Sequence, residues 1–283
     1  MTLKEMTLKI PVSVQVFGYG VIGRVFTQAL SHSFVDSKVF DHINVYDVNE
    51  EKFNVFNEDF FPRKNVFWGV PPNSDFYFIC THEDNVMGVI EENKLYERDG
   101  LTIIRSTVPP KATKEIMELF NFHVCHNPEF INGKKTPEQE LYPRRVVIGE
   151  CCKEHGDILY DLYKKIMVDG FDRYYRMNTT ESELTKLFAN ANLSIQLTMW
   201  NEFYRLVENL NGNYLCMDKM ADAVCSDPRM AKHRPYKWGR GWGGHCLPKD
   251  FKALIQSYLE NCIGVPRMLM DIYGSNDSLE VYV

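Results

Sequence analysis

The feature that most constrains the fold of this sequence is a set of three glycines, spaced G-x-G-x-x-G, between an apolar strand and a helix. Val12–Phe17 has the composition of a buried strand, and it is followed at once by Gly18-Tyr19-Gly20-Val21-Ile22-Gly23 and by a helical apolar pattern that extends to about Phe34. A second apolar segment ends at Asp47, 24 residues after the last glycine. The spacing G-x-G-x-x-G after a strand, with an acid at the end of the next strand, predicts a dinucleotide-binding unit.

Each glycine of this turn has a separate expected role. Gly18 makes the tight turn, Gly20 lets the backbone approach a pyrophosphate at the positive end of the helix, and Gly23 allows the helix to pack closely on the strand. Asp47 is expected to accept hydrogen bonds from the adenosine ribose and to repel a 2′-phosphate, which favours NAD over NADP. The alternative is a glycine turn in an α/β protein that binds no dinucleotide. The expected cofactor-binding residues here are Gly18, Tyr19, Gly20, Val21, Ile22, Gly23 and Asp47.

The first part of the chain alternates between strand-like and helix-like segments. Such alternation predicts an α/β fold with a Rossmann-like, doubly wound and mostly parallel sheet that has helices on both faces. Further strands are predicted at Ile43–Tyr46, Phe76–Cys80, Leu101–Arg105, Val146–Gly149 and Phe171–Arg176, and helices at Glu50–Asn57, Asn85–Glu92, Lys111–Phe120 and Glu154–Met167.

The pattern becomes helical after Asn178. Thr180-Glu181-Ser182-Glu183 has the spacing of a capping box, and an apolar stripe of helical period runs from Leu184 to Leu210, where Asn211-Gly212 ends it. We therefore expect a dinucleotide-binding domain at residues 1–177 and an all-α domain at 178–283. Further helices are predicted in the second domain at Leu215–Val224, Lys249–Glu260 and Pro266–Val281.

Composition excludes several other classes of protein. A formal net charge of −6 with no run of lysine and arginine argues against a nucleic-acid-binding protein. No stretch approaches the roughly 18 apolar residues of a transmembrane helix, and the first residues lack the apolar core of a signal peptide. None of the eight cysteines forms a C-x-x-C pair, so neither a disulfide framework nor a metal site is expected. Reduced thiols fit a cytoplasmic protein.

A second segment, Trp238–Asp250, carries residues suited to nucleophilic chemistry. It holds four glycines within six positions, which gives a backbone able to wrap closely around a ligand. Cys246 follows them, just before Pro248 at a predicted helix start. A helix N-terminus stabilises a thiolate and makes such a cysteine nucleophilic. The alternative is a buried structural cysteine beside a glycine-rich turn.

Five motifs, in order, make this sequence resemble the UDP-glucose/GDP-mannose dehydrogenase family. The family's K-S-T-[VI]-P is matched by Arg105-Ser106-Thr107-Val108-Pro109, and its N-P-E-F by Asn127-Pro128-Glu129-Phe130. Pro143 and Arg145–Gly149 follow at the family distance. An E-x-x-K-x-x-x-N helix ending in N-E is matched by Glu183, Lys186, Asn190 and Asn201-Glu202, and G-G-x-C-x-P-K-D by Gly243–Asp250.

The resemblance implies an NAD-dependent enzyme that oxidises the C6 alcohol of a nucleotide sugar, expected to be UDP-glucose, to a carboxylate. Cys246 would hold the aldehyde as a thiohemiacetal and then as a thioester, which water hydrolyses. Lys186 would stabilise an oxyanion, and Asn190, four residues on, would share its helix face and assist it. Asp250 would orient a water or Lys186.

The resemblance also implies further roles. Thr107 and Glu129 would position water and serve in proton transfer, and Thr81 and Thr107 would lie beside the cofactor. The alternatives without a catalytic role are a solvated helix face for Lys186 and loop caps for Thr107 and Glu129. The residues expected to bind substrate are Phe130, Lys186, Arg240, Gly241, Trp242 and Gly243, and no metal is implied.

The sequence departs from the family at three places. Gly133 stands where the family usually has a second glutamate, which is linked to water activation, and the segment after Phe76–Cys80 is short. The sequence ends just after a segment like the family's long connecting helix, so the C-terminal UDP-binding domain is expected to be absent. Three hypotheses remain: a dehydrogenase of UDP-glucose, the same chemistry on another sugar, or a non-catalytic nucleotide-binding remnant. A homodimer is expected, with the Thr180–Leu210 helices crossing at its axis.

Overall fold

The structure is a computed structural model that describes residues 8, 10–37, 39–60, 65–131, 136–167, 171–210, 215–230, 235, 237–244 and 246–278. The chain divides into two compact units, Met1–Lys186 and Leu187–Val283. The division falls inside one long helix, α7 (Thr179–Asn209). The boundary expected from the sequence, between residues 177 and 178, lies just before that helix.

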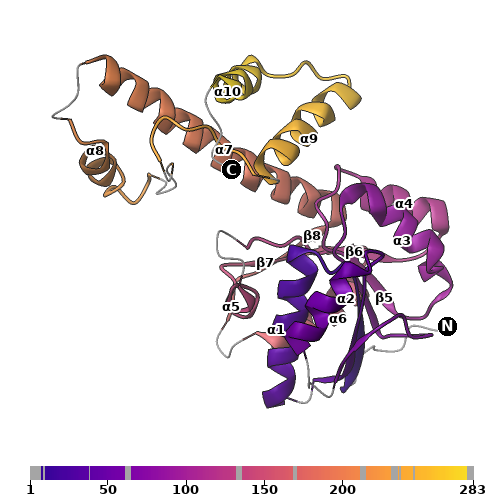
Figure 1. Cartoon of the computed structure of the whole chain (residues 1–283). Helices are drawn as coiled ribbons and strands as arrows, with labels where there is room; N and C mark the ends of the chain where they lie inside the picture. Colours follow the sequence, from indigo (N-terminus) through magenta and orange to yellow (C-terminus); the bar gives the residue numbers. More distant parts are fainter. Residues whose placement is uncertain are drawn as a thin grey trace. The chain divides into compact units, whose positions relative to one another are not determined.

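The first unit is built on a sheet of eight described strands (Figure 1). The strands lie in the order β3-β2-β1-β4-β5-β6-β7-β8, and every neighbouring pair is parallel except β6 and β7. The strand order reverses between β1 and β4, which confirms the expected doubly wound, mostly parallel sheet. The strands are β1 (Val12–Phe17), β2 (Phe40–Tyr46), β3 (Val66–Trp68), β4 (Phe76–Ile79), β5 (Leu101–Ile104), β6 (Val124–His126), β7 (Val146–Glu150) and β8 (Tyr174–Asn178).

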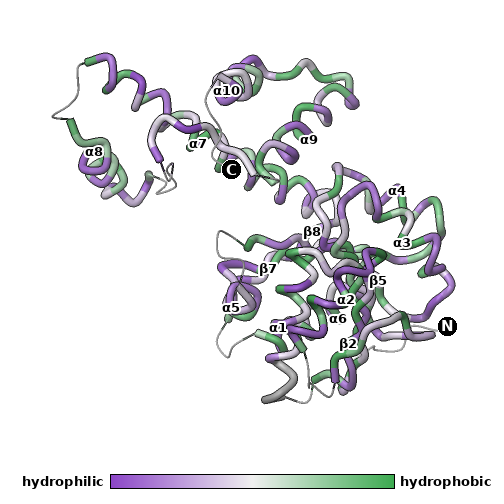
Figure 2. Tube along the Cα trace, in the orientation of Figure 1, coloured by the Kyte–Doolittle hydropathy of each residue, from purple (hydrophilic) through white to green (hydrophobic). Residues whose placement is uncertain are grey.

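Helices cover both faces of this sheet. Residues of α1, α2 and α6 share one hydrophobic cluster with the strands, and residues of α3 and α4 share the other. Every residue of β4 and β5 is buried, as in parallel sheets covered on two sides. Hydrophobic residues run through the strands, whereas α5 is mostly hydrophilic (Figure 2). The helices are α1 (Val21–Ser37), α2 (Glu51–Phe60), α3 (Val86–Glu92), α4 (Ala112–Phe120), α5 (Pro137–Leu141) and α6 (Lys153–Ile166), with single 3-10 turns at Glu83–Asn85 and Leu95–Glu97.

A buried guanidinium joins four of these elements. Arg105, directly after β5, donates to Asn127 Oδ1 and Tyr163 Oη at 2.5 Å each and to Glu140 Oε1 at 2.6 Å. Burial raises the pKa of the Glu140 carboxyl, which the nearby Arg105 charge opposes. Because a buried charge is tolerated only when it is paired, Arg105 fixes the loop after β6, α5 and α6 relative to β5.

The start of α7 belongs to the first unit and is anchored there by polar contacts. Asn178 and Glu181 exchange hydrogen bonds of 2.9 Å between side chain and backbone N–H, so the capping box begins at Asn178 and not at Thr180, as the sequence suggested. Glu183 instead accepts hydrogen bonds from the backbone N–H groups of Lys111, at 2.6 Å, and Thr113, at 2.8 Å. It thereby caps α4.

The second unit is helical, as expected. Beside the remainder of α7 it contains α8 (Met217–Val224), α9 (Cys246–Glu260) and α10 (Arg267–Asp277). One hydrophobic cluster joins Ala191 of α7 with Trp242, Phe251, Leu254 and Leu269, and a second joins Trp200 of α7 with Met217, Ala221 and Cys225. Within the described part of the chain, we find no helix with the length and apolarity needed to span a membrane.

Most elements lie where the sequence predicts them, and the omissions are short. The predicted strand at Val12–Phe17 coincides with β1, whereas the last strand is shifted to Tyr174–Asn178. The three-residue strands β3 and β6 and the five-residue helix α5 were not predicted, because segments so short carry no measurable periodicity. The expected end of the last helix, at Val281, lies outside the described residues.

The first unit should lose stability in acid because of His126. Its ring is buried between Ser182 Oγ, 2.9 Å from Nδ1, and the carbonyl oxygen of Ser106, 3.3 Å from Nε2. Burial lowers the pKa of His126 to about 3, whereas the unfolded chain takes up this proton below about pH 6.5. The stabilising contribution of the neutral ring is therefore complete above about pH 6.5 and falls by about 1.4 kcal/mol for each pH unit below it.

Urea unfolding at pH 7.5 and pH 5.5 measures this dependence. The His126→Gln variant should lose less of its free energy of unfolding between the two pH values than the unmodified chain, by roughly 1 kcal/mol. The matched control is His42→Gln, on β2, which should keep the full dependence. Equal pH dependence in the unmodified chain and in His126→Gln would contradict the assignment.

Candidate active site

The glycine turn between β1 and α1 has the geometry that the sequence predicts. Gly18 has a φ of +92°, and a Cβ there would lie 2.8 Å from the Cys80 carbonyl oxygen. A Cβ on Gly23 would lie 1.8 Å from the Gly18 carbonyl oxygen, so only glycine lets α1 begin this close to β1. Next to Gly20 there is open space. These are the three demands of a pyrophosphate-binding turn.

A cavity of about 390 Å³ lies beside this turn, at the carboxyl ends of β1, β2 and β4. Open α/β sheets bind their ligands at this point, where the strand order reverses. Among the described residues that line the cavity there is no lysine or arginine to receive a 2′-phosphate. Its lining includes Gly18, Gly20, Tyr46, Asp47, Thr81, His82, Asp84, Asn85 and Glu92.

Asp47 has the position and the free acceptor capacity to bind a ribose. Its Oδ2 accepts a hydrogen bond of 2.6 Å from the Tyr19 backbone N–H, and its Oδ1 accepts one of 2.9 Å from the Asn49 N–H. Each carboxylate oxygen can accept a second hydrogen bond. The two backbone donors hold the carboxylate in place while it faces the cavity. The residues of this site fit an NAD molecule.

Of the other side chains expected at the cofactor, some line the cavity and others do not. Tyr19 is buried, its hydroxyl donates to Asp59 Oδ2 at 2.6 Å, and it is not among the residues that line the cavity; its link to the site is the backbone N–H that Asp47 accepts. Burial also raises the Tyr19 pKa. Val21 is half exposed and Ile22 partly buried in the first turn of α1. Thr81 lines the cavity, but Thr107, half-buried after β5, is not among its lining residues.

A buried ion pair forms the second part of the site. The Lys186 ammonium, on α7, donates to Glu129 Oε1 at 2.9 Å and to the Glu129 carbonyl oxygen at 2.7 Å. Both side chains are less than a tenth exposed. Phe130 lies beside the pair, with the Lys186 Nζ 5.3 Å and the Arg145 guanidinium 3.9 Å from its ring centre. A cavity of about 270 Å³ adjoins Glu129 and Phe130.

The second unit contains a further group of candidate residues, among them the thiol that the sequence singles out. Cys246 is the first residue of α9 and is exposed. Asp250, one turn later and 1% exposed, accepts a hydrogen bond of 2.5 Å from Asn190 Nδ2 on α7. The Lys249 ammonium lies 2.9 Å from the other carboxylate oxygen of Asp250. From the sequence, Asp250 was expected to orient a water or Lys186. In the structure its side-chain partners are Asn190 and Lys249.

The glycine-rich loop before α9 is held by two asparagines. Asn201 of α7 accepts from the Gly239 N–H at 3.2 Å and donates to the Arg240 carbonyl oxygen at 2.6 Å. Asn276 of α10 accepts from the Trp242 N–H at 2.7 Å. A Cβ on Gly241 would come within 2.9 Å of that Asn276 amide oxygen.

Trp242 was expected to bind substrate, but its side chain is an anchor of this loop. The indole is 4% exposed and donates to Thr198 Oγ1 at 2.8 Å, so only its backbone remains for a ligand. Gly243 is partly buried and Arg240 half-buried on the same loop. Gly133, Arg234 and His245 lie outside the described residues.

Sequence reasoning identified Asn201 only as part of a motif and missed Lys249 and Asn276. The available signal for Lys249 was its place beside Asp250 in the Pro-Lys-Asp run. Asn276 gave no local signal, because its contact with Trp242 joins residues 34 positions apart. The first unit therefore holds a paired buried ammonium, and the second unit holds a thiol at a helix start with a buried carboxylate one turn later.

Comparison with known proteins places these parts in one family. Residues 71–167 match the NAD binding domain of the UDP-glucose/GDP-mannose dehydrogenase family, and residues 180–278 match its central domain. The UDP-glucose 6-dehydrogenase of Rickettsia felis is 30% identical over 220 residues, which are 74% of this chain and 47% of that protein. The UDP-N-acetyl-D-mannosamine dehydrogenase of Pyrococcus horikoshii is 29% identical over 59% of this chain and 40% of its own length. The chain spans about half the length of the relatives it matches.

Solved structures show the same fold. The UDP-glucose dehydrogenase of the hyperthermophilic archaeon Pyrobaculum islandicum superposes with a TM-score of 0.78, over 98% of this chain and 70% of that one, at 20% identity. The UDP-D-ManNAc dehydrogenase of Pyrococcus horikoshii superposes with a TM-score of 0.75, over 94% of this chain and 68% of that one, at 21% identity.

Replacing Asp47 with serine should narrow the preference for NAD over NADP. The variant removes both the ribose acceptor and the charge that repels a 2′-phosphate, so NAD should bind about 10- to 100-fold more weakly while NADP loses less. Calorimetric titration with both dinucleotides gives the ratio. Asp41→Ser, on β2 but outside the cavity lining, is the control. An unchanged ratio in Asp47→Ser would mean that this carboxylate does not touch the ribose.

Proposed function

This chain belongs to the UDP-glucose/GDP-mannose dehydrogenase family, and we propose that it is an NAD-dependent oxidoreductase that converts the C6 alcohol of a nucleotide sugar into a carboxylate. UDP-glucose is the first candidate substrate, because several relatives near 30% identity are named UDP-glucose 6-dehydrogenase. UDP-N-acetylmannosamine is the second, because a dehydrogenase of that sugar is 29% identical.

The proposal rests mainly on the hydrogen bonding and the burial of the Lys186 ammonium. Two of its three N–H donors go to Glu129, and the third can reach an oxygen that gains negative charge during the reaction. A buried ammonium is already desolvated, so it stabilises such an oxygen more strongly than an exposed lysine would. Asn190 lies four residues further along α7, on the same helix face.

The chain's own residues can carry two successive oxidations at one carbon. Two NAD molecules, bound one after the other, would supply the two hydride acceptors. In the first, the alcohol loses its proton through a water to Glu129 and C6 loses a hydride, which gives an aldehyde. Cys246 Sγ then adds to C6, and its proton passes to the aldehyde oxygen. Loss of a second hydride from C6 and of that hydroxyl proton gives a thioester on Cys246.

Hydrolysis then releases the acid and restores the thiol. Water adds to the thioester carbonyl, the C–S bond breaks, and Cys246 regains its proton. Asp250, which lies one turn after Cys246 and accepts a hydrogen bond from Asn190, would take up a proton from that water. Thr107 and Glu129 would position the water, and Lys186 would stabilise the oxyanion of the intermediate.

We also propose that two copies of the chain pair through α7. The exposed apolar side chains of α7 include Met199, Phe203 and Leu206, and Leu210 follows just after the helix; they are spaced four, three and four residues apart and continue one face. Asn190 and Asn201 point the other way, into the second unit's own contacts. A self-complementary stripe of this kind fits a two-fold dimer with crossing α7 helices. The eight free cysteines fit a reducing compartment such as the cytoplasm.

The Cys246→Ala variant tests the covalent mechanism. It should fold and bind NAD as the unmodified chain does, yet its formation of sugar acid should fall by a thousandfold or more, on the order expected for loss of a nucleophile. The measurement is NADH formation at two per substrate, together with chromatography of the sugar product. Cys262→Ala, an exposed cysteine after α9, is the control and should keep full activity. Full activity of Cys246→Ala would exclude the mechanism.

Glutamate at Phe203 and Leu206 tests the dimer. The double variant Phe203→Glu/Leu206→Glu places two charges on the stripe and should shift the chain from dimer to monomer at micromolar concentration, as light scattering would show. Asn209→Asp adds a negative charge at the same end of α7 but beside the stripe, and it should leave the dimer intact. A monomeric unmodified chain would refute this assembly.

A further inference from the structure

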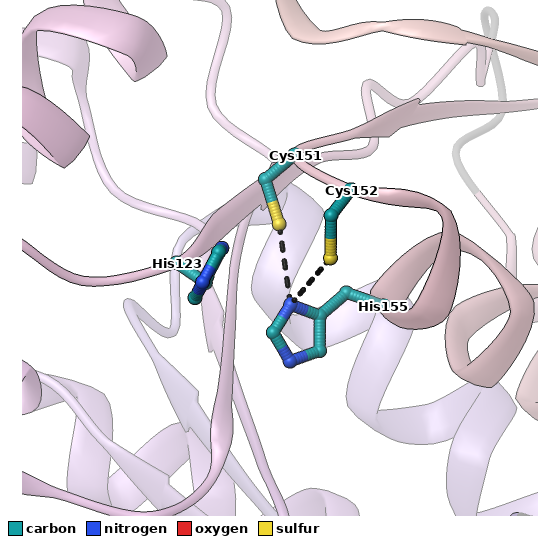
Figure 3. A group of neighbouring side chains, drawn as sticks. All are labelled: His123, Cys151, Cys152 and His155. Atoms are coloured by element: carbon teal, nitrogen blue, oxygen red, sulfur yellow. Dashed lines mark hydrogen bonds between the residues drawn. The ribbon is translucent and has the colours of Figure 1, made fainter. Parts of the chain in front are cut away.

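Four side chains that the proposed reaction does not use converge at one edge of the first unit (Figure 3). They are His123, Cys151, Cys152 and His155, and one ligand atom from each lies within 4.8 Å of the others. We propose that they form a binding site for a thiophilic divalent cation, for which Zn²⁺ is the best match. No metal site was expected from the spacing of the cysteines in the sequence.

The sheet itself brings these residues together. β6 and β7 are antiparallel, with His126 opposite Gly149. Continuing that register by three residues places His123 opposite Cys152, just beyond both strands. Cys152 is also the N-cap residue of α6, and His155 lies in the first turn of that helix. The ligands are therefore held by two strand ends and a helix start, which are the rigid parts of the unit.

The distances fit a tetrahedral site. Bonds of about 2.3 Å to sulfur and about 2.0 Å to nitrogen imply sulfur–nitrogen separations of about 3.5 Å around zinc. His155 Nδ1 lies 3.4 Å from Cys151 Sγ and 3.3 Å from Cys152 Sγ. The His123 and His155 rings meet edge to face, with 4.8 Å between their centres. Figure 3 shows both sulfur atoms directed at His155, with His123 to the left of these three residues.

The donor set selects the class of cation. Two thiols and two imidazoles are soft and borderline ligands, which favour Zn²⁺ over Mg²⁺ or Ca²⁺. On binding, the two cysteines would each release a proton, and the two thiolates would balance the charge of the cation. His123 is exposed and the other three side chains are partly buried, which leaves a path for entry.

The position of the cluster separates it from the reaction. His123 precedes the amino end of β6, whereas the N-P-E-F loop follows its carboxyl end. Because β1, β4, β5 and β6 are parallel, the nucleotide cavity lies at the carboxyl edge of the sheet and the cluster at the opposite edge. A cation here would join β6, β7 and α6 and act on stability.

A disulfide is the main competing use of these thiols. Cys125 Sγ lies 3.8 Å from Cys151 Sγ, so oxidation could join Cys125 and Cys151 and remove one ligand. The two possibilities are distinguished by Cys125→Ser, which abolishes that disulfide but leaves all four proposed ligands in place. Under the metal proposal this variant binds Zn²⁺ as the unmodified chain does.

The test is a titration of the full-length chain, stripped with a chelator and kept reduced, with Co²⁺ as a spectroscopic probe and then with Zn²⁺ in competition. We expect one equivalent of Co²⁺ to give tetrahedral absorption with thiolate charge-transfer bands, and Zn²⁺ to displace it. The Cys151→Ser/Cys152→Ser variant should bind Zn²⁺ more weakly by over a hundredfold, beyond the roughly 10- to 100-fold cost of losing an outer partner. His123→Gln, a single change at an exposed side chain, should also weaken it.

Two further measurements keep the result decisive. The control Cys216→Ser/Cys262→Ser removes two exposed thiols of the second unit and should leave Zn²⁺ binding unchanged. In the unmodified chain, Zn²⁺ should protect Cys151 and Cys152 from alkylation, read by mass spectrometry, and this needs no variant. Weak binding without charge-transfer bands, equal affinity in Cys151→Ser/Cys152→Ser, or alkylation unaffected by Zn²⁺ would overturn the proposal.

Discussion

The Lys186 ammonium and the Glu129 carboxylate lie 2.9 Å apart in a place where both are almost fully buried. Removing either partner would leave an unpaired buried ion, which typically costs about 3 to 5 kcal/mol. The pair therefore holds the loop after β6 against the start of α7. Glu183 and Ser182 add to the same attachment, since one caps α4 and the other contacts His126. Where α7 begins is thus decided by buried polar groups, and the continuity of the helix then fixes where Asn190 stands along it.

How much of the fold the sequence predicts depends on how local each signal is. The β1 strand, the glycine turn and the acid at Asp47 are adjacent features with a strong combined pattern, and they were placed correctly. The reversed direction of β7 was not predicted, because strand direction depends on pairing between distant segments. The capping box shows the same limit. Two overlapping segments, Asn178–Glu181 and Thr180–Glu183, had suitable residues for a capping box. Glu183 instead accepts hydrogen bonds from the backbone at the start of α4, so the box forms at Asn178.

The candidate site follows a similar division. Spacing on α7 correctly puts Lys186 and Asn190 one turn apart, but it does not tell which acid each one meets. The structure pairs Lys186 with Glu129 and Asn190 with Asp250, so the two helix residues have different electrostatic roles. Trp242 is the counterexample. An aromatic residue in a glycine-rich loop suggests ligand stacking, yet its indole is buried and bonded to Thr198. Burial depends on the packing of α7 and α10, which no local motif records.

The His123, Cys151, Cys152 and His155 cluster shows what such pattern rules cannot detect. Metal motifs such as C-x-x-C work because two ligands share one turn, so that close spacing in sequence means closeness in space. Here an antiparallel register between β6 and β7 takes the place of that spacing, and His123 comes from a segment 28 residues before Cys151. The same strand, β6, leads at its other end into Asn127 and Glu129. A change at the cluster can therefore reach the loop after β6 through this strand, or through α6, which carries both His155 and Tyr163, a partner of Arg105. Because the cluster lies at the opposite end of β6 from that loop, a cation there should alter unfolding more than turnover.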